Sequence, residues 1–179
     1  MSTNWRISSF NGALLAAYFI PTWTIIALRI MVSPVHGFYE RPNVSVAFYV
    51  SDVLQFSAPW MIRTAWLLAL GRLIVVAFFA IFVALLTRPS IRKAGGCNEA
   101  LSIALGIGSL ICFASMLMAA KVGEVEALRL HATELLMLLG TMIVLVVERP
   151  AEVAIGEVTA KAEPAAPLSL QQPQCVDNR

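Results

Sequence analysis

Hydrophobic positions are gathered into long runs along the chain, and polar positions are gathered into the connections between them. The runs cover approximately residues 12–32, 58–87, 100–120 and 130–147. A helix needs about 20 predominantly apolar residues to cross the hydrocarbon core of a bilayer. Each run meets or nearly meets that length, so the pattern predicts an all-α fold, an integral membrane four-helix bundle within residues 1–149.

The longest connection, between the first and second runs, has a weaker pattern of its own. Val46, Val50, Val53 and Leu54 recur at helical spacing, and Asp52 lies off that face. The segment is too short and too polar to span a bilayer, so we expect an amphipathic helix at the membrane interface. The alternation in Val-Ser-Val-Ala-Phe also permits a strand.

Local signals mark several helix boundaries. Ser57 and Pro59 predict an N-cap and a first-turn residue for the second long helix. Pro21 predicts a kink within the first helix, and Ser33-Pro34 predicts its end. From residue 150 to 179 the chain is rich in Ala, Glu and Pro and contains no aromatic residue, which predicts a disordered cytoplasmic tail.

The composition agrees with lipid as the main solvent and the lipid bilayer as the main partner. Hydrophobic residues make up 59% of the chain and charged residues only 13%, against about 25% charged in soluble domains. The net charge is +2, with no basic stripe, so we expect no nucleic-acid partner. Cys97, Cys112 and Cys175 lack CxxC spacing and predict neither a zinc site nor a disulfide framework.

Lysine and arginine are distributed unequally between the two sides of the predicted bundle. The densest group, Arg88, Arg92 and Lys93, lies in the second connection, on the same side as both termini. Because basic residues concentrate in cytoplasmic connections, we expect a multi-pass protein of the cell inner membrane with both termini in the cytoplasm.

Three charged residues lie inside the apolar runs and need an explanation, because a charge within a helix costs from about 2.5 to more than 10 kcal/mol in the membrane. They are Arg29, Arg72 and Glu134, and the alternation of helix direction places all three in one leaflet. We expect an intramembrane charge cluster that joins the helices, with Arg72 against Glu134. Two alternatives remain: separate extension of the arginines to the head groups, or a surplus positive charge that binds a lipid head group, a quinone oxygen or a small anion.

Two further features carry candidate chemistry. His131 lies three residues before Glu134 on one helical face, and His36 is expected on the same side, so these residues are candidate metal ligands. Hydrogen-bonded histidines are the simpler interpretation, and we expect no metal and no cofactor. In the third run, Ser102, Gly106 and Gly108 form a predicted helix-packing face, either within the bundle or against another subunit or a second copy.

The end of the first helix also carries a short resemblance. The Leu-Arg-Ile sequence around Arg29, followed by His36-Gly37, resembles the DoxX-type small membrane proteins. The resemblance covers only this stretch, and no functional residue is transferred from it.

No catalytic motif stands out, which favours a non-enzymatic role. The small size and the small-residue face favour an accessory or structural subunit of a membrane complex. One alternative is a small transporter or carrier that uses the Arg29, Arg72 and Glu134 cluster. A second is a membrane enzyme or redox module that acts on lipid or quinone.

Overall fold

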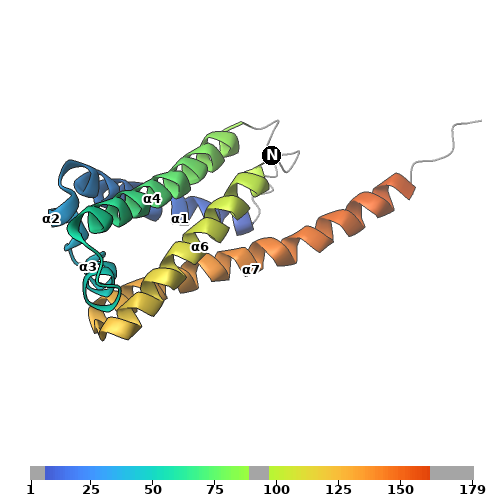
Figure 1. Cartoon of the computed structure of the whole chain (residues 1–179). Helices are drawn as coiled ribbons and strands as arrows, with labels where there is room; N and C mark the ends of the chain where they lie inside the picture. The colour runs from blue at the N-terminus through green and yellow to red at the C-terminus, as the bar shows by residue number, and fades with distance from the viewer. Residues whose placement is uncertain (1–6, 89–96, 162–179) are drawn as a thin grey trace, which may run out of the picture.

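Four long helices dominate the chain, as the sequence pattern predicts. The computed structural model describes residues 7–88 and 97–161, with side chains described as far as residue 148. Its long helices are α1 (Ile7–Val32), α4 (Ala58–Leu86), α6 (Cys97–Val122) and α7 (Val125–Lys161). The first connection holds α2 (Pro34–Phe38), α3 (Val44–Phe48) and the π-helical turn η1 (Tyr49–Val53). The described residues contain no strand, and the four long helices are long and apolar enough to cross a membrane (Figure 1).

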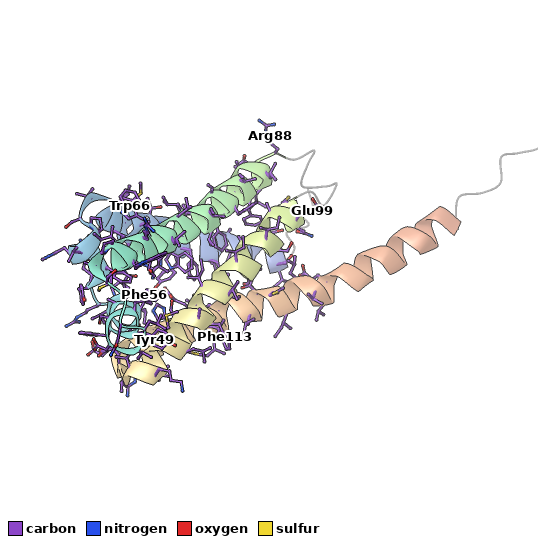
Figure 2. All side chains as sticks on the ribbon, viewed as in Figure 1. Tyr49, Phe56, Trp66, Arg88, Glu99 and Phe113 are labelled. Atoms are coloured by element: carbon purple, nitrogen blue, oxygen red, sulfur yellow. The ribbon has the colours of Figure 1, made fainter. Side chains whose placement is uncertain are left out.

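Consecutive long helices pack side by side and alternate in direction. α1 packs on α4, α4 on α6 and α6 on α7, and α7 also contacts α1. Figure 2 shows the consequence: Arg88 and Glu99 lie at one end of the bundle, and Tyr49, Phe56 and Trp66 lie at the other. The end of α4 and the start of α6 are therefore at the opposite end of the bundle from the first connection.

The first connection is helical, so the alternative of a strand is wrong. Val46 and Val50 are buried as the helical pattern predicts, and α3 packs against α6. Val53 and Leu54 are exposed at the end of the π-helical turn that begins at Tyr49. A π-turn takes more residues than an α-turn, so a step of three residues from Val50 to Val53 no longer returns to the buried face, whereas Leu54 follows the end of the turn.

The predicted start of the second long helix is confirmed. Ser57 is extended (φ −65°, ψ 157°) and precedes α4, and its carbonyl accepts hydrogen bonds from the backbone N–H groups of Trp60 and Met61 at 2.9 and 3.2 Å. Pro59 lies in the first turn, where its missing N–H costs nothing. Pro21 lies inside α1, which continues to Val32.

The end of the last helix differs from the predicted boundary. The sequence predicts that the helix stops near residue 147 and that a disordered tail begins at 150, but α7 continues through Pro150 to Lys161 (Figure 1). An interior proline removes one helix hydrogen bond and clashes with the preceding turn, but the Ala, Glu and Lys residues that follow Pro150 favour helix. The remainder of the predicted tail, residues 162–179 with Cys175, lies outside the described residues.

Candidate functional site

A cluster of polar side chains lies inside the bundle and takes members from all four long helices. We call it the polar cluster; it consists of Trp23 from α1, Arg72 from α4, Cys112 from α6, and His131 and Glu134 from α7. No member is more than 5% exposed. Buried polar groups need partners, so the contacts of these side chains decide what the cluster can do.

The Glu134 carboxylate is the common acceptor of the polar cluster. The Trp23 Nε1–H donates to Glu134 Oε1 at 3.4 Å, and the Cys112 thiol donates to Oε2 at 3.6 Å. His131 Nδ1 lies 3.2 Å from the same Oε2. One carboxylate on α7 is thus linked to α1 and to α6, and it also fixes the imidazole one turn earlier on its own helix.

His131 joins the polar cluster to the first connection. Its Nε2 lies 3.1 Å from the Pro42 carbonyl oxygen. A carbonyl oxygen only accepts hydrogen bonds, so Nε2 must carry a proton. The contact between Nδ1 and Glu134 then needs a second proton, carried by either partner. The pair is therefore either an imidazolium with a carboxylate or a neutral imidazole with a carboxylic acid, and its net charge is zero in both forms.

Arg72 lies at the midpoint of α4, equally far along the chain from Ala58 and Leu86. Its guanidinium carbon is 5.7 Å from the centre of the Trp23 ring, a cation–π distance. Its Nε and Nη1 have no hydrogen-bond acceptor, and among the described residues no carboxylate oxygen lies within 4.0 Å of the guanidinium. Arg72 and Glu134 share the cluster as expected, but they contact the same indole rather than each other.

Arg29 is predicted to join this cluster, and the structure places it elsewhere. Its guanidinium forms an ion pair with Glu40 at 3.1 Å, and 61% of its side chain is exposed. Arg29 lies in the last turn of α1, within reach of the carboxylate that follows α2. An arginine near a helix end reaches polar surroundings at low cost, which explains why it does not turn inward.

The candidate metal ligands are only partly brought together. His131 and Glu134 are adjacent in the polar cluster, whereas His36 is exposed in a surface hollow that Arg29 and Glu40 also line. Within residues 7–88 and 97–148, no group of three or more His, Cys, Asp or Glu side chains is arranged to bind a metal ion.

The predicted helix-packing face of α6 divides into two parts. Gly108 is buried, and a Cβ atom added there would lie 3.4 Å from Leu138 on α7, in ordinary contact. Gly106 is exposed with no atom within 4 Å of such a Cβ, and the Ser102 hydroxyl donates to the Glu99 carbonyl of its own helix. Gly108 therefore packs within the bundle, and Gly106 and Ser102 do not.

Sequence reasoning missed Trp23, Cys112 and the Pro42 carbonyl. One signal was available for Trp23, because it lies deep in an apolar run, away from the interface where tryptophan is usually found. A buried indole N–H needs an acceptor, and Glu134 is the carboxylate at a matching depth. Nothing in the sequence indicates that Cys112 or the Pro42 carbonyl would contact the polar cluster.

Comparison with known proteins does not extend this description. No protein-family model matches the chain, and no curated protein or solved structure shows significant similarity to it. The short resemblance to DoxX-type proteins gains no support, so a functional assignment depends on the polar cluster and its surroundings.

Proposed function

We propose that the chain is a non-enzymatic accessory or structural subunit of a membrane complex, and that the polar cluster fixes the relative positions of its helices. The observation that carries the proposal is the set of contacts to Glu134, which come from α1, α6 and α7. Buried polar contacts of this kind commonly hold membrane helices together. The contact of His131 with Pro42 extends the same role to the first connection.

The interior beyond the polar cluster supports a structural role over transport. Toward the end of the bundle that carries the second connection, the core is filled by apolar side chains, with Phe19, Phe79, Phe82 and Leu101 all fully buried. Carriers bind substrate at a site that opens to each side of the membrane in turn, and this apolar core separates the cluster from one side.

A small carrier is the second candidate, and Arg72 is the observation that favours it. The Glu134 and His131 pair has no net charge, so the guanidinium leaves the cluster with a surplus positive charge. Its unpartnered N–H groups are donors that an anion or a carbonyl oxygen could accept from.

Purification in mild detergent of the wild type and of the double variant Arg72→Leu with Glu134→Leu tests the proposed function. A partner protein in stoichiometric amount is expected with both, because the double variant removes the two charges together, although Trp23 and Cys112 lose their acceptor. Loss of the partner from a folded double variant would contradict a purely structural cluster. Purification without any partner would contradict the role as a subunit.

We also propose the cell inner membrane as the location, with both termini in the cytoplasm, on the strength of the basic residues around Arg88. Reporter fusions after Arg88 and after Lys161 are expected to report cytoplasm. A fusion at Arg41, whose side chain is 92% exposed, is expected to report the opposite side. Reversed labels at all positions would contradict the orientation, and identical labels at Arg41 and Arg88 would contradict four spans.

A further inference from the structure

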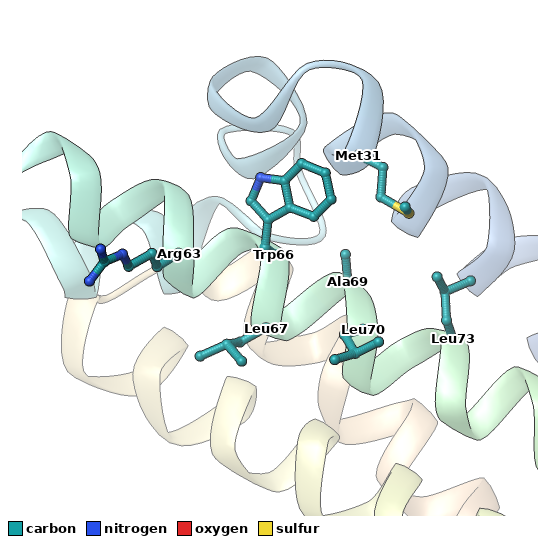
Figure 3. A pocket seen from close by; sticks show the side chains of 7 residues that line it. All are labelled: Met31, Arg63, Trp66, Leu67, Ala69, Leu70 and Leu73. Atoms are coloured by element: carbon teal, nitrogen blue, oxygen red, sulfur yellow. The ribbon is translucent and has the colours of Figure 1, made fainter.

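An apolar groove runs along the outer surface of the bundle between α1 and α4. We call it the α1/α4 groove; it is lined by Met31 of α1 and by Arg63, Trp66, Ala69, Leu70 and Leu73 of α4 among others, and its volume is about 480 Å³. Figure 3 shows Trp66 of α4 and Met31 of α1 on either side of Ala69. Because the side chain of Ala69 is small, the larger side chains of Trp66 and Met31 leave a groove above it.

The groove opens toward the surroundings of the bundle. Met31, Trp66 and Leu70 are exposed, whereas Ala69 is buried. Because α4 is apolar enough to cross a membrane, this surface faces lipid. In the hydrocarbon core of the membrane, the apolar molecule that could fill the groove is the acyl chain of a lipid.

The dimensions of the groove match one leaflet. Arg63 and Leu73 mark its ends along α4 (Figure 3), and ten residues of helix rise about 15 Å. The hydrocarbon core of a bilayer is about 30 Å thick, so the groove extends over about half of it. Arg63 lies near the start of α4, against the ring of Trp60.

The charge at that end of the groove is positive. Arg63 is exposed, the first turn of α4 has no acidic residue, and no described carboxylate oxygen lies within 4.0 Å of the guanidinium. The Arg63 guanidinium lies 4.8 Å from the centre of the Trp60 ring. This cation–π contact orients the group and leaves its charge in place.

We propose that the α1/α4 groove is a binding site for a phospholipid with an anionic head group. One acyl chain lies along Ala69 and Leu73, and the phosphate accepts hydrogen bonds from Arg63. Arginine binds phosphate through paired N–H donors, which gives the contact direction as well as charge. This lipid site is independent of the role of the polar cluster.

Native mass spectrometry of the delipidated full chain, with added phosphatidylglycerol or phosphatidylcholine of identical acyl chains, tests the proposal. The wild type is expected to retain phosphatidylglycerol about fivefold more than phosphatidylcholine, the effect of one basic residue near anionic lipid. Arg63→Gln is expected to remove that preference. Leu70→Trp is expected to fill the groove and to reduce retention of both lipids.

Two variants serve as matched controls. Arg88→Gln removes an exposed arginine at the other end of α4, and Leu110→Trp enlarges an exposed leucine on α6. Both are expected to behave as the wild type. Equal retention of the two lipids by the wild type, or equal losses in the controls, would overturn the proposal. A dimer of the wild type that Leu70→Trp dissociates would also overturn it, because the occupant would then be a second copy of the chain.

Discussion

Glu134→Ala is expected to lower the free energy of unfolding by about 3–5 kcal/mol, the cost of removing one member of a buried charged set. The substitution takes the acceptor away from Trp23 and Cys112, and it leaves His131 and Arg72 without a carboxylate in the cluster. Unfolding by increasing fractions of a denaturing detergent in mixed micelles measures the change. Thr133→Ala is the control, because this exposed neighbour bonds only to the Leu130 carbonyl of its own helix.

Coupling to Arg72 gives a second measurement on the same cluster. Arg72→Leu combined with Glu134→Leu is expected to cost less than the sum of the two single changes, because no unpaired charge is left inside the bundle. If the losses of stability in the two single variants simply add up in the double variant, Glu134 does not stabilise Arg72 through the Trp23 ring that both contact.

Gly37→Ala is expected to destabilise the fold by about 1–3 kcal/mol, the usual cost of overpacking. An added Cβ would lie 2.8 Å from both the Cα and the N of Ile30, and backbone atoms cannot rotate away as a side chain does. α2 would have to move from α1, and the Gly37 carbonyl would move with it, although it accepts a hydrogen bond from Asn43 Nδ2 at 2.9 Å.

Gly106→Ala is the matched control for that substitution. The position is exposed in α6 with nothing within 4 Å of the added carbon, and alanine favours helix more than glycine does. The same detergent titration is expected to show no loss of stability. An equal effect at both glycines would mean that the close approach of α2 to α1 is unimportant for the fold.

The sequence predicts the long helices well because their cause is local. Twenty apolar residues in succession have few alternatives to a membrane helix, and Ser57 and Pro59 mark the start of α4 through their own backbone chemistry. These features need no knowledge of how the helices pack.

The composition of the polar cluster depends on packing, and sequence reasoning therefore recovers only part of it. Whether Arg29 turns inward depends on the position of Glu40, which the fold of the first connection decides. The contact with Pro42 is made by a backbone carbonyl, an acceptor that every residue has. The π-turn at Tyr49 shifts the buried face of its helix in a way that hydrophobic spacing does not show.

The hydrogen bond between His131 and Pro42 has a consequence for biosynthesis. The two residues are 89 positions apart, so the ribosome makes the acceptor well before the donor, by roughly 4–18 s at typical rates of about 5–20 residues per second. Late in that interval α1, the first connection and α4 are already made, but the Pro42 carbonyl lacks its hydrogen bond from His131. The interior is complete only when α7 arrives, because α7 supplies the contacts to Trp23, Cys112 and Pro42.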